Sequence, residues 1–389
     1  AAQPVQLAPA PVSMTAASSV VPNAPAPYRG LLFLGASNLG ELKQRLLNEI
    51  ESVRKGVLPP NQIPTPEQLR QPERLVIDYT DAEELLKRAE KALKGFDNDT
   101  QAGWQALTAH AVYHGSGIPG KIAFLFPGQG SQYVNMLRDL REVEPVVAET
   151  FREADEVMTP ILGRSLTSYI YDEGDEESQK KAEADLRNTT ITQPAVLTTN
   201  VALLRVMEKF GFKPDLVIGH SLGEYAALVA AGVLSFSEAL KVVSARGREM
   251  AKVSVADNGC MAAVSAPLEQ VEAVIQKVNG YVVIANINSP LQCVIGDDTL
   301  AVEEAIASFQ SAGLQATKIP VSHAFHTRSV APASEPLRRV IAAMDLQTPR
   351  LPIVANVTGK IYPNTREEIL DILAQQVASP VQFIQGVHT

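Results

Sequence analysis

The chain has 389 residues, of which 46% are hydrophobic and 20% are charged, and its formal net charge is −9 at pH 7. This length predicts roughly two or three domains, and no stretch reaches the about 20 apolar residues of a membrane span. The acidic balance argues against a nucleic-acid or anionic-membrane partner, and only two cysteines, Cys260 and Cys293, argue against a disulfide framework and fit a reducing, cytoplasmic location.

The N-terminal part of the chain is predicted to be a linker followed by a small α/β domain. Residues 1–28 are almost all Ala, Pro, Ser and Val and carry no charge, which is typical of a linker in a chain excised from a longer protein. Residues 29–117 alternate strand-like runs ("LLFLGAS", "RLVIDYT") with helical runs, the first capped by Asn38. Nothing in this domain suggests chemistry, because His110 and His114 have no third metal ligand.

A short apolar strand, "KIAFLF", opens the predicted main domain, residues 118–389, and runs directly into "PGQGSQ". A Gly-x-Gly after a strand can bind phosphate, but no Lys-Ser/Thr follows, and the third glycine of a dinucleotide fingerprint is absent. A nucleotide site is therefore disfavoured. The alternative is that this loop presents its backbone N–H groups to another ligand.

The stretch "DLVIGHSLGEYAALVAAG" (215–232) reads as a buried strand followed by an alanine-rich helix. Gly219, Ser221 and Gly223 match G-x-S-x-G, the sharp strand-to-helix turn that exposes a nucleophilic serine. An ordinary tight turn is the alternative, and the flanking strand and helix favour the nucleophile. The N–H of Leu222 is one candidate donor to a developing oxyanion, and the "PGQGSQ" backbone is suited to supply the second.

The helix that follows, "SFSEALKVVSARGREM", begins with the capping-box pattern Ser235-x-x-Glu238. It carries Arg246 and Arg248. An arginine on a helix is usually solvated, but the residues before this pair are mostly apolar. An arginine held against such a core can bind a carboxylate through two parallel hydrogen bonds.

Residues 258–324 follow the order β-α-β-β-α-β, which is typical of ferredoxin-like domains. We therefore predict an α/β-hydrolase-like large subdomain with a parallel sheet, into which a ferredoxin-like small subdomain is inserted. The loop "VSHAFHTRS" follows the insertion. A serine needs a base to take its proton, and His323 and His326 are both candidates, whereas neighbours on such a turn, such as His220, usually point apart.

Residues 118–389 contain six motifs, each of which occurs once: "FPGQGSQ" (126–132), "TQPAVLTTN" (192–200), "GHSLGEYAA" (219–227), "SARGREM" (244–250), "HAFHT" (323–327) and "PVQF" (380–383). In this order they resemble the malonyl-CoA:acyl carrier protein transacylases, and in particular the acyltransferase domains of type I polyketide or related fatty-acid megasynthases. Residues 29–117 resemble the adapter that joins a ketosynthase to the acyltransferase in those enzymes.

The resemblance implies a ping-pong transfer of a malonyl group from malonyl-CoA, through a serine ester, to the phosphopantetheine thiol of an acyl carrier protein. It implies no cofactor and no metal. Ser221 matches the nucleophile and His326 its base. The backbone N–H groups of Gln129 and Leu222 match the oxyanion hole. The backbone carbonyl of Gln376 matches the group that orients the histidine in place of an acid.

The resemblance also implies malonyl selection. Arg246 matches the arginine that pairs with the free carboxylate of a malonyl group. "HAFH" and a residue other than Gln after the serine are associated with malonyl, because Phe325 would fill the space that an α-methyl group needs. A pocket distinguishes one methyl group by only about 1–3 kcal/mol, so leakage is expected. We also expect His220 and His323 to line the substrate pocket.

Two other functions stay open. An α/β serine hydrolase, esterase- or thioesterase-like, needs an acid to complete a triad, and Asp257, Asp297 and Asp298 lie at the edges of the inserted unit, where we expect surface positions. A non-catalytic docking scaffold would show no acylation. In the family the chain continues past "PVQF" with a further strand, so we also expect a domain truncated at Thr389, which is less stable and less active than a longer one.

Overall fold

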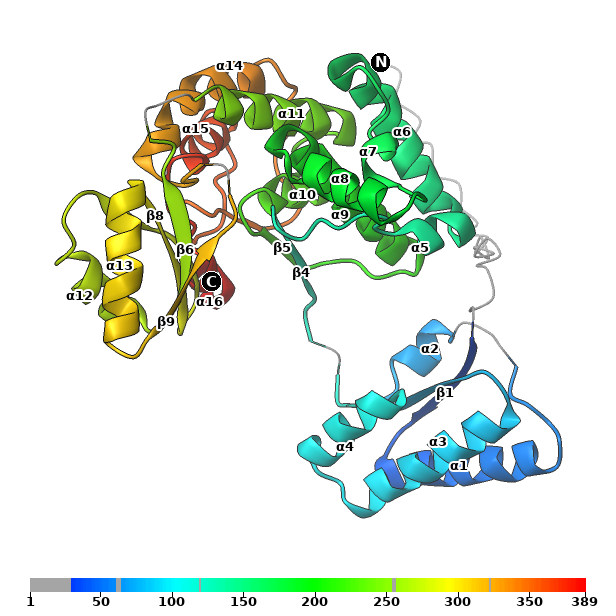
Figure 1. Ribbon diagram of the computed structural model, residues 1–389. Coiled ribbons are helices and arrows are strands. Elements are labelled where there is room, and N and C mark those ends of the chain that lie inside the picture. Colours follow the sequence, from blue (N-terminus) through cyan, green and yellow to red (C-terminus); the bar gives the residue numbers. More distant parts are fainter. Residues whose placement is uncertain (1–28, 61–63, 119, 254–256, 322) are drawn as a thin grey trace, which may run out of the picture. The chain divides into compact units, whose positions relative to one another are not determined.

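The chain forms two compact units, one that ends at Gly120 and one that begins at Lys121 (Figure 1). Each unit has hydrophobic cores of its own. The predicted linker, residues 1–28, lies outside the described residues. The computed structural model describes residues 29–60, 64–118, 120–253, 257–321 and 323–389.

The first unit is a three-stranded antiparallel sheet, in the order β1-β2-β3, against which helices α1 and α3 pack (Figure 1). Its elements are β1 (Gly30–Ala36), α1 (Leu39–Arg54), α2 (Pro66–Leu69), β2 (Glu73–Tyr79), α3 (Ala82–Asp97), α4 (Gln101–Leu107), a 3-10 turn (Thr108–His110) and β3 (Val112–Ser116). The side chain of Asn38 accepts a hydrogen bond from the N–H of Glu41 at 2.9 Å, so the predicted cap of α1 is confirmed. The strand β3 was not predicted.

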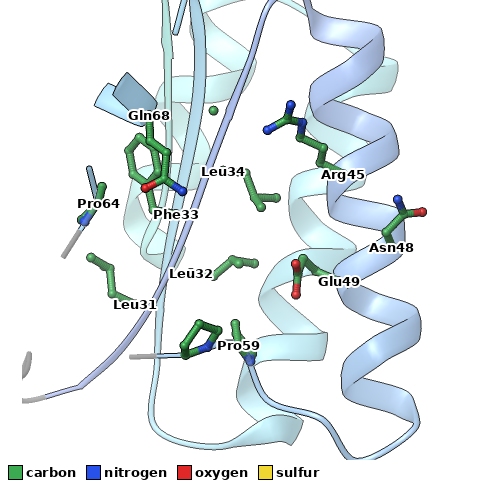
Figure 2. A pocket seen from close by; sticks show the side chains of 12 residues that line it. Leu31, Leu32, Phe33, Leu34, Arg45, Asn48, Glu49, Pro59, Pro64 and Gln68 are labelled. Atoms are coloured by element: carbon green, nitrogen blue, oxygen red, sulfur yellow. The ribbon is translucent and has the colours of Figure 1, made fainter. Parts of the chain in front are cut away.

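A cavity of about 370 Å³ lies along β1, the edge strand of this sheet (Figure 2). Residues of β1 form one wall, and Arg45, Asn48 and Glu49 of α1 lie opposite. The described lining contains no serine, cysteine or histidine. This cavity therefore lacks the nucleophile and the base that acyl chemistry needs, although it is larger than the cavity of the second unit described below.

The large subdomain of the second unit is built on a parallel sheet in the order β10-β5-β4, as predicted. The strands are β4 (Ala123–Phe126), β5 (Leu216–Gly219) and β10 (Ile353–Val354). The central strand β5 ends in the buried residues Val217, Ile218 and Gly219. It therefore delivers the residues that follow it, His220 and Ser221, to the middle of the carboxyl end of the sheet, where ligands of parallel sheets bind.

Helices surround this sheet. They are α5 (Arg138–Val143), α6 (Pro145–Leu162), α7 (Thr167–Ile170), α8 (Glu176–Arg187), α9 (Thr189–Lys209), α10 (Gly223–Ala230), α11 (Phe236–Lys252), a 3-10 helix (Arg328–Ala333), α14 (Ser334–Ala342), α15 (Arg366–Gln376) and α16 (Phe383–His388). The predicted capping box of α11 is confirmed, because Ser235 and Glu238 exchange side-chain and backbone hydrogen bonds. Over the described ranges, none of the helices has the length and apolar character required to cross a membrane.

The small subdomain follows α11 and is a four-stranded antiparallel sheet in the order β7-β8-β6-β9 (yellow-green to yellow in Figure 1). Its elements are β6 (Cys260–Ser265), α12 (Leu268–Ile275), β7 (Val282–Ser289), β8 (Gln292–Asp297), α13 (Thr299–Ser311) and β9 (Gln315–Ile319). This is the predicted ferredoxin-like arrangement, in which the last strand pairs beside the first. Both cysteines are buried in it as free thiols.

The segment after α15 ties the two subdomains together. The N–H of Val381 donates to Ala285 O, and the N–H of Ile287 donates to Val381 O, both at 2.9 Å. The N–H of Gln382 donates to Asn356 O at 2.8 Å. The segment after α15 is thus fixed both to β7 and to the loop that follows β10.

Candidate active site

Ser221 lies on a strained turn between β5 and α10. Its backbone φ is 51°, in the left-handed region that residues other than glycine rarely adopt. A Cβ atom on Gly219 would lie 2.0 Å from the carbonyl carbon of Gly223, and one on Gly223 would lie 2.1 Å from Phe126 O. Neither position has room for a larger residue. The turn therefore has the geometry that G-x-S-x-G predicts.

The side chain of Ser221 meets that of His326. Their Oγ and Nε2 atoms lie 2.6 Å apart, although the two residues are 105 positions apart in the chain. His326 also has a left-handed backbone, with φ of 62°, and its N–H donates to Val377 O at 3.1 Å. The structure thus brings His326, and not His323, to the serine.

The imidazole of His326 is held as one tautomer. Its Nδ1 lies 3.0 Å from Gln376 O and 3.1 Å from Ser379 O. Carbonyl oxygens only accept hydrogen bonds, so Nδ1 carries the proton and Nε2 is left to accept from the serine hydroxyl. Burial, with the nearby charges of Arg246 and His220, lowers the pKa of His326 to about 3, which keeps the ring neutral.

The loop after β4 packs directly against the turn. A Cβ atom on Gly128 would lie 2.3 Å from His220 O and 3.4 Å from Leu222 N, so only glycine permits this approach. The next residue is Gln129. In the part of the chain that the structure describes, neither the N–H of Gln129 nor that of Leu222 donates a hydrogen bond to a protein acceptor. Both donors are therefore available beside Ser221.

A cavity of about 190 Å³ opens onto the Ser221–His326 pair. Its lining is Gln129, His220, Ser221, Arg246, Met250, Met261, Asn286, Asn288, Val294, Ile319, Val321, Phe325 and His326. The residues come from both subdomains, and most of those from the small subdomain are apolar. The cavity is therefore large enough for a small acyl group and has a partly apolar lining.

Arg246 brings a buried positive charge into this cavity. Its side chain is 2% exposed, and its Nη1 donates to Gln193 Oε1 at 3.1 Å. Its Nε and Nη2 have no hydrogen-bond partner among the described residues. Burial lowers the pKa of Arg246, but a guanidinium stays protonated in proteins. Arg248 lies outside the cavity, where its Nη1 donates to Ser244 Oγ.

Of the remaining residues predicted to line the pocket, two lie in the cavity and one does not. Phe325 and His220 line the cavity, and His220 Nε2 lies 2.8 Å from Asn288 Oδ1. His323 is not among the described lining residues, and its Nε2 lies 3.1 Å from Val253 O. The expectation that His323 lines the pocket is therefore wrong. The physical reason is that its ring is buried against the end of α11.

The aspartates considered for a hydrolase triad do not meet the histidine, because His326 Nδ1 faces two carbonyls. Asp297 is also not a surface residue, contrary to expectation. It is 1% exposed, has a φ of 128° and accepts a hydrogen bond from Ser329 Oγ at 2.5 Å. Its place at the end of β8, between β6 and β7, explains its burial.

Sequence reasoning missed a buried polar network behind the serine. Asn356 accepts a hydrogen bond from the Ser221 N–H at 2.5 Å, and Glu224 accepts from Tyr362 Oη at 2.6 Å. Gln193, which contacts Arg246, was missed as well. One signal was visible, because Glu224 is the only charged residue of the apolar helix α10. Asn356 follows a two-residue strand that has no pattern to read.

The serine lies on a strained strand-to-helix turn and forms a hydrogen bond with a neutral histidine, beside free N–H donors. Enzymes that form an acyl ester on a serine have this arrangement. Residues 123–389 match the family described as the acyl transferase domain. The chain belongs to this acyltransferase family.

Named relatives agree with this assignment. The malonyl CoA-acyl carrier protein transacylase of Bacillus subtilis (strain 168) is 38% identical over 273 residues, which are 69% of this chain and 82% of that protein. The solved malonyl CoA-acyl carrier protein transacylase from Coxiella burnetii is 36% identical, with a TM-score of 0.62 over 68% of this chain and 81% of that chain. Polyketide synthase GfsA of Streptomyces halstedii is 37% identical over 251 residues, which are 62% of this chain and 3% of that protein.

Proposed function

We propose that residues 121–389 transfer a malonyl group from malonyl-CoA to the phosphopantetheine thiol of an acyl carrier protein, through an ester on Ser221. One observation carries the choice of substrate. The guanidinium of Arg246 is buried in the same cavity as Ser221, and its Nε and Nη2 have no hydrogen-bond partner among the described residues. A buried cation of this kind is costly unless an anion joins it, and a carboxylate matches its fork of donors.

Acylation begins with attack of Ser221 Oγ on the thioester carbon of malonyl-CoA, while the hydroxyl proton passes to His326 Nε2. The developing oxyanion accepts hydrogen bonds from the N–H groups of Gln129 and Leu222. The carbon–sulfur bond then breaks, and His326 returns its proton to the sulfur of coenzyme A. The products are malonyl-Ser221 and free coenzyme A.

The second half-reaction reverses these roles. The carrier thiol gives its proton to His326 Nε2 while its sulfur attacks the ester carbon. The carbon–oxygen bond breaks, and Ser221 Oγ takes the proton back. The carbonyls of Gln376 and Ser379 hold the Nδ1 proton throughout, which supports the imidazolium in both steps without an acid. The route draws on no cofactor and no metal.

A bound carboxylate would also strengthen the base. The charge of Arg246 is one of the causes that lower the pKa of His326. Pairing Arg246 with the malonyl carboxylate offsets that charge, so the imidazole becomes more basic only when a carboxylated substrate is bound. Selectivity then acts on the chemical step as well as on binding.

Phe325 is proposed to set the size limit of the pocket. Its side chain lines the cavity and is 8% exposed. It would occupy the space of an α-methyl group, and this favours malonyl over methylmalonyl by about 1–3 kcal/mol.

The surroundings of this domain are proposed from the relatives and the composition. The first unit would be the adapter between a ketosynthase and the acyltransferase of a polyketide or fatty-acid megasynthase, and one relative is a polyketide synthase. Free, buried cysteines suit a cytoplasmic enzyme. The acidic chain is not expected to bind nucleic acid or membrane.

Intact mass spectrometry tests the proposal. Incubation with malonyl-CoA should add one malonyl group to the chain, and Ser221→Ala should abolish the addition. A carrier thiol should then remove the group faster than water does. Labelling that survives Ser221→Ala, or rapid hydrolysis of simple esters without transfer to the carrier, would contradict the proposed function and favour a hydrolase. An absence of any acylation would favour a docking scaffold.

A further inference from the structure

Glu224 is a buried carboxylate that forms no salt bridge with a lysine or arginine of the described chain, although the charge of Arg246 acts on it through space and lowers its pKa. It is fully buried in the first turn of α10, three residues after Ser221. Its Oε1 accepts from Tyr362 Oη at 2.6 Å and from the N–H of Asn356 at 3.1 Å, and its Oε2 accepts from Gln376 Nε2 at 2.7 Å. Burial raises its pKa to about 7. Such a group is costly to keep in a protein interior, so its neighbours indicate what it does.

Gln376 connects Glu224 to both members of the reacting pair. Its Nε2 donates to Ser221 O at 2.7 Å as well as to Glu224, so both amide hydrogens are used. Its backbone carbonyl accepts from His326 Nδ1 at 3.0 Å. The orientation of one residue therefore affects the backbone of the serine and the ring of the histidine together.

Asn356 connects Glu224 to the other side of the turn. Its backbone N–H donates to Glu224, its Oδ1 accepts from the Ser221 N–H, and its Nδ2 donates to Gly219 O at 2.6 Å. Asn356 and Gln376 thus hold Ser221 through its N–H and its carbonyl. Because Ser221 and His326 both have left-handed backbones, they need such external restraint to stay in place.

We propose that Glu224 is the positioning residue of the Ser221–His326 pair, because its carboxylate fixes Gln376 and Asn356, which in turn fix the serine turn and the histidine ring. This inference rests on the acyl chemistry proposed above. Glu224 forms no hydrogen bond with a reacting atom, so it acts on the rate of ester formation through the residues that it positions.

Glu224→Gln isolates this role. The amide has nearly the same size and can still accept hydrogen bonds from Tyr362 and Asn356 through its oxygen. Its nitrogen, however, would face Gln376 Nε2, and two donors cannot bond. Gln376 cannot turn its amide over without losing its hydrogen bond to Ser221 O.

The matched control is Glu144→Gln. Glu144 is a glutamate of the same unit that is 1% exposed and pairs with Lys209 at 2.5 Å, and it does not line the cavity. Both substitutions remove a buried carboxylate, so both should lower the melting temperature. Only the substitution at Glu224 disturbs the contacts of Ser221 and His326.

Two rates are compared in the full chain. One is the single-turnover formation of malonyl-Ser221 at saturating malonyl-CoA, and the other is the labelling of Ser221 by a fluorophosphonate, which has no carboxylate for Arg246. Glu224→Gln should lower both rates by about 10- to 100-fold without changing the half-saturating malonyl-CoA concentration. Glu144→Gln should leave both rates unchanged. If Glu224→Gln does not fold, Tyr362→Phe removes one of the three hydrogen bonds and should lower both rates in parallel.

Unchanged labelling of a folded Glu224→Gln chain would overturn the proposal, as would a loss confined to the half-saturating concentration. Equal losses in Glu224→Gln and Glu144→Gln would overturn it too, because the effect would then be general destabilisation. Failure of the proposed function looks different. A wild-type chain that reacts with the fluorophosphonate but not with malonyl-CoA would contradict the malonyl assignment, while the ratio of fluorophosphonate rates would still test Glu224.

Discussion

His326 has both ring nitrogens committed in the structure before any substrate is bound. Two carbonyls hold the Nδ1 proton, and Nε2 faces Ser221 Oγ. A carbonyl supplies direction without the negative charge that an aspartate would supply. The ring is therefore oriented as in a triad, while its basicity depends on its surroundings and on whether an anion pairs with Arg246.

This arrangement predicts an unusual pH profile for the serine. The base must be unprotonated, and the pKa of His326 is lowered from the ordinary 6.5 to about 3. The fluorophosphonate labelling rate should therefore show no histidine inflection near 6.5 and should fall only below about pH 4, as the ring begins to protonate. The pKa of Glu224 is about 7, so the same profile in Glu224→Gln removes any inflection that Glu224 contributes.

Substitution of the histidines provides the comparison. His326→Ala should slow labelling by about 10²–10⁴-fold, which is the usual contribution of a positioned base. His323→Ala should act mainly through packing and lower the melting temperature, because its ring lies against Val253 O. The reverse ranking would contradict the assignment of His326. So would a labelling rate that falls through pH 6.5 in both the wild-type chain and Glu224→Gln.

At the scale of elements, three glycines let the loop after β4, the serine turn and the start of α10 approach one another. Gly128 touches His220 O, Gly219 approaches the backbone of Gly223, and Gly223 approaches Phe126 O. The Gln129 N–H keeps its position beside Ser221 only if the loop stays this close.

Gly128→Ala should therefore damage catalysis more than folding. The added methyl would meet His220 O and push the loop outward, taking the Gln129 N–H with it. We expect the rate of malonyl-Ser221 formation to fall by about 10²–10³-fold, the cost of losing one oxyanion donor. Gly120→Ala is the control, since a Cβ there meets no atom of the described residues within 4 Å. Equal rates in the two variants would argue against an oxyanion role for this loop.

The elements that could be predicted are those with a local signal. The strand and helix around Ser221, the cap at Asn38 and the capping box at Ser235 are each set by a few neighbouring residues, and the structure contains them. The β-α-β-β-α-β order of the small subdomain was likewise readable from residues 258–324.

The network behind the serine had one local signal, the single charge of Glu224 in the apolar helix α10, and this signal did not reveal its partners. Glu224 lies 132 positions from Asn356 and 152 from Gln376, and only the pairing of β5 with β10 and the packing of α15 bring them together. An acidic residue in the first turn of a helix also has an ordinary explanation, the helix dipole. That explanation concealed Glu224. The expectation that His323 lines the pocket failed for a similar reason, because the spacing of two histidines in one loop does not say which rings face the cavity.

At the scale of the whole molecule, the hydrophobic cores are separate. One cluster joins α1, α3 and the first sheet, between Leu32 and Val112, and the other two lie entirely between Phe126 and Val377. Each unit therefore contains what a domain needs to fold by itself.

We expect residues 121–389, expressed alone, to fold and to form malonyl-Ser221 at the rate of the whole chain. The reacting residues and the cavity all belong to this unit. Circular dichroism and single-turnover mass spectrometry on the two lengths would check this. A shortened chain that folds but acylates much more slowly would mean that the first unit contributes to catalysis.

The central claim is that Arg246 makes this acyltransferase select a carboxylated acyl group. The most direct measurement is the ratio of kcat/KM for malonyl-CoA to that for acetyl-CoA, in the wild-type chain, Arg246→Ala and the control Arg248→Ala on the same helix. Loss of a buried charge pair costs about 2 kcal/mol or more, so Arg246→Ala should lower malonyl turnover at least about 30-fold. Acetyl turnover should not fall, because acetyl has no carboxylate to pair with Arg246. Removal of the Arg246 charge also raises the pKa of His326. Arg248→Ala should leave the ratio unchanged. Equal losses for both substrates in Arg246→Ala would contradict the account and make Arg246 a structural residue.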